Sequence, residues 1–171
     1  MPDTFIKIAS VTVGSGGASS IDFTSIPSTY TDLCLKVSAR GDLAQVYDSI
    51  YFQLNGLTTS IYTRLTISGT GSSTGSGTST STSMFFGAAN GKNATANTFG
   101  NAEVYFPNYA GSTNKSSSAD IVQETNATTA YMYLGAGLTA TTSAISSIKL
   151  FLESNLFLQY STATLYGIKN S

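Results

Sequence analysis

An all-β fold, an antiparallel β-sandwich of the jelly-roll kind, is predicted from three features of the sequence. Apolar and polar residues alternate in short segments, turn residues recur about every 8 to 15 positions, and no segment carries apolar residues at helical spacing. The 171 residues fit one domain, 1–171, which is long enough to fold around a single core without disulfides or metals. We expect about nine or ten strands.

The clearest succession of elements runs from Ser19 to Ser38. Ile21 and Phe23 end one strand, and Pro27 fixes a corner because its ring restricts φ and favours an extended residue before it. A second strand follows, in which alternate residues are apolar: Leu33, Leu35 and Val37. This stretch predicts strand, corner and strand, and it contains no group that resembles a catalyst.

Two further strands are expected before residue 69. Phe5 to Val13 has apolar residues on both parities, which predicts a strand covered on both faces. Tyr47 to Leu54 places Ile50, Phe52 and Leu54 on one face. Asn55-Gly56 follows, a pair that tolerates positive φ at both positions, so we expect a hairpin whose return strand contains Ile61, Leu65 and Ile67.

The segment from Gly69 to Ser83 contains only Gly, Ser and Thr. None of these side chains can anchor a hydrophobic core, so the segment is predicted to be an exposed, flexible loop at 69–83. The later strands are expected at Met84 to Ala88, Ala102 to Phe106, Ser118 to Gln123, Ala130 to Leu138, Ile145 to Leu152 and Leu156 to Tyr166.

The charge composition argues against several classes of partner. Charged residues make up 10% of the chain, against about 25% in typical soluble domains. The net charge is -1 and the basic residues are scattered, so we expect no nucleic-acid partner. No apolar run reaches membrane-spanning length, and the first residues do not resemble a signal peptide, which predicts synthesis in the cytoplasm and no membrane contact.

The inventory of reactive residues also argues against catalysis. The chain has no histidine, which excludes a serine triad, a Cys-His pair and most zinc sites, and Cys34 lies in an alternating strand that favours a packed side chain. Paired carboxylates for glycoside hydrolysis are the remaining option, but their spacing marks no pair. We therefore expect no enzyme, no cofactor and no metal; the carboxylates considered are Asp42, Asp48, Glu103, Asp120 and Glu124.

Tyrosines are the remaining candidates for a functional surface. The chain has ten tyrosines and no tryptophan, and five tyrosines fall on the parity opposite the main apolar residues. An outward row of this kind can stack on sugars or pack against a neighbouring subunit, and cross-strand pairing within one sheet explains it equally well. The predicted interaction surface consists of Tyr51, Tyr62, Tyr105, Tyr131 and Tyr133.

Several phrases of the sequence resemble small structural proteins of tailed bacteriophages, notably cyanophages and marine phages. These phrases are Val11–Gly17, Ile21–Pro27, Tyr30–Leu33, Asn126–Tyr131 and Gln159–Ile168. The resemblance spans nearly the whole chain, except the segment from Gly69 to Ser83, and it contains no catalytic motif. It implies a virion protein made in the host cytoplasm.

Two roles are compatible with this resemblance. A capsid decoration (cement) protein would bind the phage major capsid protein, as a homotrimer, and stabilise the head shell. A tail-fibre or receptor-binding module would use the same sandwich to recognise host-surface glycans. Decoration is favoured because the first expected strand begins almost at Met1, with no coiled-coil or adaptor segment for mounting on a tail.

Overall fold

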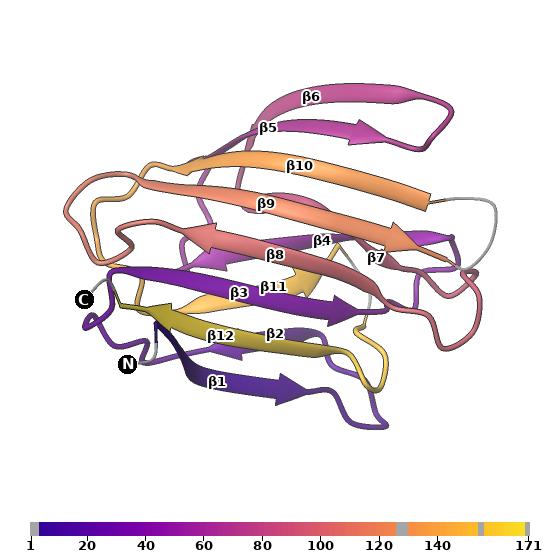
Figure 1. The fold of residues 1–171 in the computed structure, drawn as a ribbon, viewed down its shortest axis with the longest axis horizontal. Coiled ribbons are helices and arrows are strands. Elements are labelled where there is room, and N and C mark those ends of the chain that lie inside the picture. The colour runs from indigo at the N-terminus through magenta and orange to yellow at the C-terminus, as the bar shows by residue number, and fades with distance from the viewer. Residues whose placement is uncertain (1–3, 126–129, 154–155, 170–171) are drawn as a thin grey trace.

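The computed structural model describes residues 4–125, 130–153 and 156–169, and these form two antiparallel sheets packed face to face (Figure 1). The predicted β-sandwich is confirmed, and no helix occurs in these residues. The larger sheet contains, in spatial order, β1 (Phe5–Thr12), β12 (Thr162–Ile168), β3 (Asp32–Ala39), β8 (Gly100–Phe106), β9 (Lys115–Glu124), β10 (Ala130–Thr139), β5 (Tyr62–Gly69) and β6 (Thr74–Ser81). The smaller sheet contains β2 (Ser20–Phe23), β11 (Ile148–Leu152), β4 (Tyr47–Leu54) and β7 (Met84–Asn90).

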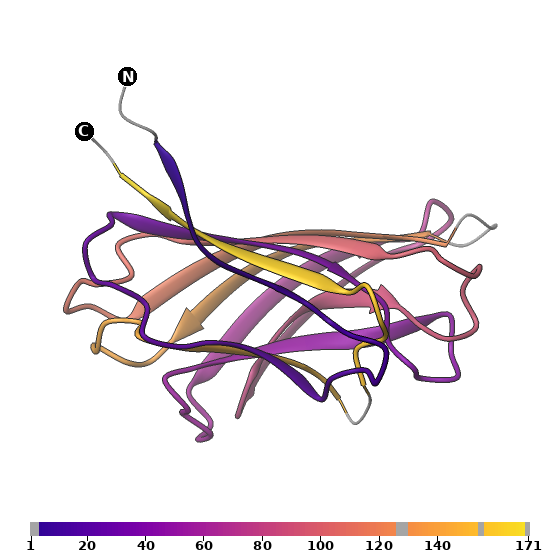
Figure 2. The same cartoon turned by 90° about the horizontal axis from the view of Figure 1, so that it is seen from below.

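The core lies between the two layers, which Figure 2 shows edge-on. Ile50, Phe52 and Leu54 of β4 are fully buried, as their alternation predicts. The Phe52 ring meets Phe106 of β8 edge to face, with centroids 5.3 Å apart. Each such side chain contributes about 1.5–3 kcal/mol by leaving water, so the alternating residues fix which face of each strand points inward.

The corner between β2 and β3 is held by buried tyrosine and backbone contacts. The Tyr109 side chain is fully buried, and its hydroxyl donates a hydrogen bond to the Pro27 carbonyl. Ile26 N donates to Ser146 O at 2.9 Å. The predicted succession of strand, proline corner and strand is therefore correct, and the corner is tied to both neighbouring loops.

The sequence predicted that β1 would be covered on both faces, and this prediction is wrong. Strand β1 is an outer strand of the larger sheet, and none of its residues is buried. The register shifts between Lys7 and Ala9, a bulge that adds one residue to β1. Ile8 and Ala9 both pack against the core as a result, so apolar residues of both parities serve one face.

The predicted hairpin between β4 and β5 is wrong, although its turn is present. Asn55 and Gly56 have φ values of 54° and 67°. The Asn55 side chain, however, binds the connection before β11, where its Oδ1 accepts hydrogen bonds from Ser146 N at 2.8 Å and Ser147 N at 3.1 Å. Strand β4 already pairs with β11 and β7, so the chain crosses to the other sheet after this turn.

The predicted loop at 69–83 is also wrong, because Thr74–Ser81 forms strand β6. It pairs with β5 in unbroken register from Tyr62↔Ser81 to Gly69↔Thr74. Hydroxyls support the pairing: Thr63 and Thr80 are hydrogen-bonded at 3.1 Å. Backbone hydrogen bonds to a neighbouring strand can hold a segment in a sheet without apolar side chains in the core, and threonine favours extended backbone.

Candidate functional site

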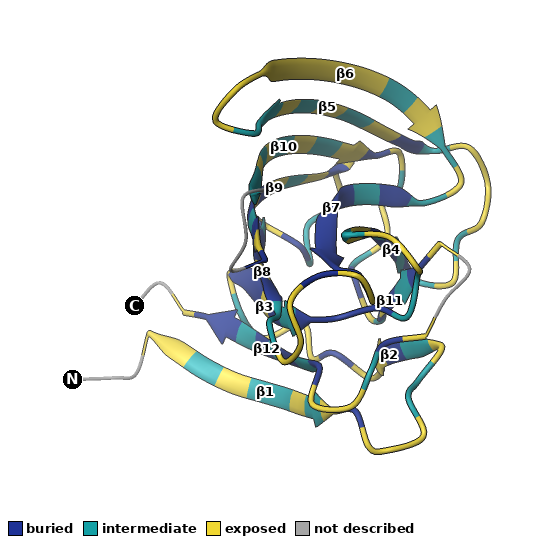
Figure 3. Cartoon of the chain, turned by 90° about the vertical axis from the view of Figure 1, so that its right-hand side faces the viewer, coloured by how far each residue is buried: buried dark blue, intermediate teal, exposed yellow. Residues whose placement is uncertain are grey.

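Strands β5 and β10 expose the side chains that sequence alternation assigned to the core. In β5 the inward residues include Tyr62, and the outward ones include Leu65 and Ile67. In β10 the outward residues include Met132 and Leu134. Both strands extend beyond the smaller sheet and curve over β7, as Figure 3 shows. The apolar side chains of these two strands therefore face solvent.

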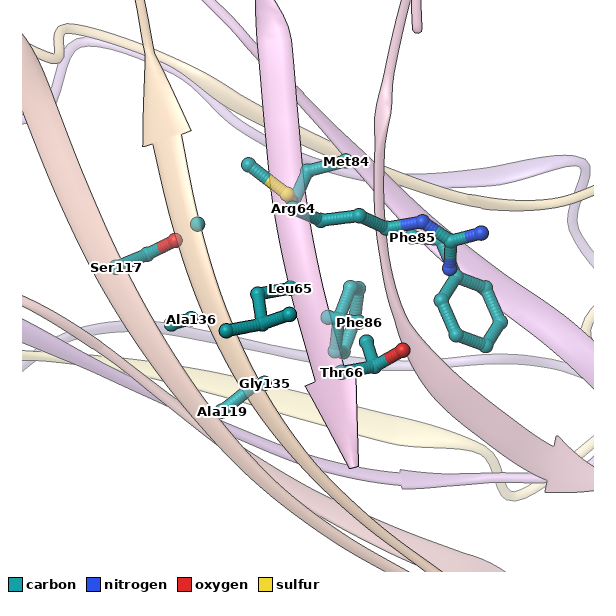
Figure 4. A pocket seen from close by; sticks show the side chains of 11 residues that line it. Arg64, Leu65, Thr66, Met84, Phe85, Phe86, Ser117, Ala119, Gly135 and Ala136 are labelled. Carbon is teal, nitrogen blue, oxygen red and sulfur yellow. The ribbon is translucent and has the colours of Figure 1, made fainter. Parts of the chain in front are cut away.

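Gly137 belongs to the alternate residues of β10 that face inward, toward β7. A Cβ at Gly137 would lie 2.6 Å from Met84 Cε, closer than side chains approach one another. Gly137 therefore leaves room for the Met84 side chain of β7. Figure 4 shows the same region, where the Arg64 guanidinium carbon lies 4.3 Å from the centre of the Phe85 ring. The enclosed volume is about 10 Å³, which is room for one water and no ligand.

The exposed apolar surface forms one continuous face, which we call the β5/β10 face. Leu134 lies opposite Ile67, and Ala136 lies opposite Leu65. Leu134 is 60% exposed. The face amounts to roughly 500 Å², at the upper end of what ordinary monomers expose. It consists of Leu65, Ile67, Met132, Leu134, Ala136 and Leu138.

Strand β6 extends this face to the edge of the sheet. The neighbours of Leu65 and Ile67 on β6 are Thr78 and Ser76, so the face continues without a charge. The outer side of β6 has no strand partner in the described part of the chain, and β6 contains no proline, bulge or charged residue. Free edges usually carry such protection, so this edge is open to another chain.

The five predicted tyrosines do not form an outward row. Tyr62 is the clearest error, because it is 1% exposed and its hydroxyl accepts a hydrogen bond from Leu54 N at 2.9 Å. Burial raises the pKa of Tyr62. No sequence signal marks Tyr62 as buried, because its burial depends on the crossing of the chain between the two sheets.

Three of the other tyrosines belong to a chain of ring contacts between the sheets. Tyr51 stacks on Phe151 at 5.7 Å and meets Phe85 at 5.6 Å. Phe85 contacts Tyr133 at 5.8 Å, and Tyr133 stacks on Tyr131 at 6.3 Å. These rings are half-buried, so most of their surface is used within the chain.

Tyr105 lies apart from this cluster, on the outer side of the larger sheet. Its hydroxyl donates to Asp32 Oδ2 at 2.6 Å, and Asp32 Oδ1 accepts from Asn108 N at 2.7 Å. The hydrogen bond to Asp32, with partial burial, raises the pKa of Tyr105 to about 12. Tyr105 is thus a structural link rather than part of a shared surface with the other four.

The candidate carboxylates lie in different places. Asp42 accepts from Leu156 N at 2.7 Å, Asp48 is buried, and Glu124 ends β9. Glu103 and Asp120 are cross-strand partners on the outer face of the larger sheet. Lys36 Nζ lies 2.5 Å from Glu103 Oε2, so this pair is partly neutralised.

A cleft of about 420 Å³ lies at the end of the sandwich drawn at the right in Figure 1. It is formed by three connections: β1 to β2, β7 to β8 and β11 to β12. Backbone hydrogen bonds join the first and third, from Ala18 N to Phe157 O at 3.0 Å and from Tyr160 N to Val13 O at 3.0 Å. No sequence motif indicates this cleft, because its residues are distant along the chain.

Arg40 holds the second connection in place. Its guanidinium is largely buried and donates to the carbonyl oxygens of Thr95 at 2.7 Å and Ala94 at 2.9 Å. It also donates to the carbonyls of Thr98 at 3.0 Å and Lys92 at 3.1 Å. Burial lowers the pKa of Arg40. The arginine therefore shapes the cleft by organising residues 92–98.

No three cysteine or carboxylate side chains within the described ranges are grouped so that they could hold a metal ion. The same ranges contain no helix long and apolar enough to cross a membrane. The resembling phrase that begins at Asn126 falls largely outside the described residues.

The chain was compared with protein-family models, with curated proteins and with solved structures. None of the three comparisons finds a match. The candidate surfaces are therefore defined by the chain's own geometry: the β5/β10 face with its β6 edge, and the cleft at the end of the sandwich.

Proposed function

We propose that this chain is a bacteriophage virion protein, a capsid decoration protein that binds the major capsid protein and stabilises the head shell. The observation that carries the proposal is the β5/β10 face, where two neighbouring strands expose their apolar parity. The resemblance of the sequence to phage structural proteins supplies the virion context. The chain would reach the virion after synthesis in the host cytoplasm.

Apolar contact would dominate binding under this proposal. The face is of the order of 500 Å², against the ~800 Å² that each partner contributes to a specific interface, so the β6 edge beside it would have to take part in binding. The six residues of the face are uncharged, and Asp120 of β9, the cross-strand partner of Leu134, borders them, so any salt dependence of binding should come mainly from this carboxylate. The trimeric state belongs to the same proposal, since three copies around a local axis would suit a capsid lattice.

Binding to head shells that lack this chain tests the proposal. The purified chain is mixed with the shells and the bound fraction is measured by sedimentation. Leu134→Glu places a charge at the centre of the face and should weaken binding by about 2 kcal/mol or more. Phe5→Glu makes the same kind of change at an exposed apolar residue of β1 and serves as the matched control.

Both substitutions fall on exposed side chains, so Phe5→Glu should leave the free energy of unfolding within about 0.5 kcal/mol of the wild type. Leu134→Glu places a carboxylate opposite Asp120 and should lower the free energy of unfolding by no more than about 1 kcal/mol. Equal binding by wild type and Leu134→Glu would contradict a role for the face. Failure of the wild type to bind shells at all would contradict the decoration function itself.

A tail-fibre or receptor-binding module remains the second candidate. The cleft at the end of the sandwich favours it, because loops at one end of a sandwich commonly carry binding sites. The tyrosine row supports it less, since Tyr62 is buried and Tyr51, Tyr131 and Tyr133 contact other rings. The decoration function is preferred because the β5/β10 face is a larger exposed surface than the cleft.

A further inference from the structure

The cleft at the end of the sandwich holds an aromatic side chain in a strained conformation. Tyr160 is 66% exposed and has a φ of 71°. It is the third residue of a four-residue turn closed by a hydrogen bond from Ser161 N to Leu158 O at 3.1 Å. Glycine or asparagine normally occupies this position, because a bulky residue at positive φ is strained.

Strain of this kind persists where the surrounding structure imposes it, and it is frequent at binding sites. The turn is imposed here by neighbouring contacts: Leu158 N donates to Arg40 O at 2.8 Å, and the Ser161 hydroxyl bonds the same carbonyl at 3.2 Å. These contacts fix the backbone from which the Tyr160 ring projects at the rim of the cleft. Phe99 adds a second, half-buried ring to the lining.

Uncharged hydrogen-bonding groups surround these rings. Asn97, Gln159 and Ser15 line the cleft and are exposed, and within the described residues their side chains make no hydrogen bond. Each amide offers both donors and acceptors, and the serine hydroxyl can act as either. Gly16 also lines the cleft, and a Cβ at this position would meet no atom within 4 Å, so a ligand can approach the backbone there.

The charge of the lining narrows the class of ligand. Among the described residues that line the cleft there is no carboxylate, and Arg40, their one cation, already directs both terminal nitrogens to backbone carbonyls. An anionic ligand would find no uncommitted terminal guanidinium nitrogen, and a cationic ligand would find no carboxylate. Neutral sugar rings combine a CH face that packs on aromatic rings with hydroxyls that both donate and accept.

We propose that this cleft binds an uncharged saccharide, with Tyr160 packing on a sugar ring and Asn97 and Gln159 binding its hydroxyls. The volume of about 420 Å³ lies within the range of small-molecule sites. The site is separate from the β5/β10 face, so it does not rest on the decoration function. A virion protein at the head or at the tail could carry it.

The test uses an array of neutral and sialylated bacterial and host oligosaccharides, followed by calorimetric titration of the neutral glycan that gives the strongest signal. Tyr160→Gly removes the ring and should reduce affinity roughly tenfold or more. Because glycine adopts the φ of this position without strain, the melting temperature of the variant should be unchanged or higher. Loss of binding then cannot be due to unfolding.

Asn108→Gly is the matched control, since Asn108 also has a positive φ, of 47°, and lies between β8 and β9 at the other end of the larger sheet. It should bind the glycan as the wild type does, and Gln159→Ala should bind it more weakly. The proposal is overturned if the array shows no neutral glycan bound, if only sialylated glycans bind, or if Tyr160→Gly retains wild-type affinity. Capsid binding is expected to be unaffected in all these variants.

Discussion

The hydroxyl of Tyr62, the first residue of β5, bonds to the backbone of Leu54, the last residue of β4, and thereby joins the two sheets where the chain crosses between them. Leu54 N donates to the hydroxyl at 2.9 Å, and the hydroxyl donates to Leu57 O at 2.9 Å. The ring is fully buried in the core. One side chain thus fixes the crossover that replaces the expected hairpin.

Tyr62→Phe should therefore destabilise the fold without changing its shape. The substitution leaves the buried Leu54 amide without its partner, a loss of about 1–3 kcal/mol. Chemical denaturation of both proteins measures the difference, with Tyr51→Phe as the control because the Tyr51 ring contacts would remain. Equal stability of Tyr62→Phe and wild type would contradict the proposed link.

The Tyr105–Asp32 hydrogen bond predicts a loss of stability at alkaline pH. The folded pKa of Tyr105 is raised to about 12 from an ordinary 10.0, chiefly by the hydrogen bond to Asp32. The folded state therefore holds the phenol proton more tightly than the unfolded state. Its contribution is complete below pH 10 and is lost as the pH rises to about 12.

Stability measured across this range should fall more steeply for the wild type than for Tyr105→Phe, which has no proton to lose. The tyrosinate absorbance of the two proteins, compared over the same range, identifies the group. Parallel curves for both proteins would assign the alkaline transition to another tyrosine.

Arg40 should be essential to the shape of the cleft. Arg40→Met keeps the aliphatic stem but leaves the carbonyls of Lys92, Ala94, Thr95 and Thr98 without their donor. We expect a destabilisation of about 2–4 kcal/mol and faster amide hydrogen exchange within residues 91–99. Unchanged exchange in this segment would show that other contacts hold it.

Cys34 should be unreactive until the protein unfolds globally. Burial, with a smaller contribution from Glu103, raises the pKa of its thiol to about 11, so the thiolate is rare at neutral pH. The rate of maleimide labelling should therefore match the rate of global unfolding measured by fluorescence. Rapid labelling of the native protein would contradict the burial of β3.

Local alternation predicted most of the sandwich. Leu33, Leu35 and Val37 in β3 and Ile50, Phe52 and Leu54 in β4 are buried as their spacing indicates. Alternation shows which residues share a face, but it does not show which face has a partner. In β5 and β10 that choice depends on how far the smaller sheet extends, and on Gly137 admitting Met84.

The remaining errors have the same origin in long-range contacts. Pairing with β5 makes a strand of Thr74–Ser81, and the pairing of β4 with β11 and β7 redirects the chain after Asn55-Gly56. The cleft combines Ser15, Asn97 and Tyr160, which are distant in the sequence, so no motif could indicate it. The positive φ values of Tyr160 and Asn97, a property of the folded backbone, mark the site.

Cryo-electron microscopy of the virion that carries this chain tests the central proposal most directly. The decoration function predicts copies of the sandwich on the faces of the head shell, with Leu65, Ile67, Met132 and Leu134 buried against neighbouring protein. Density for the chain at the tail tips, or copies on the head whose β5/β10 face points to solvent, would contradict it.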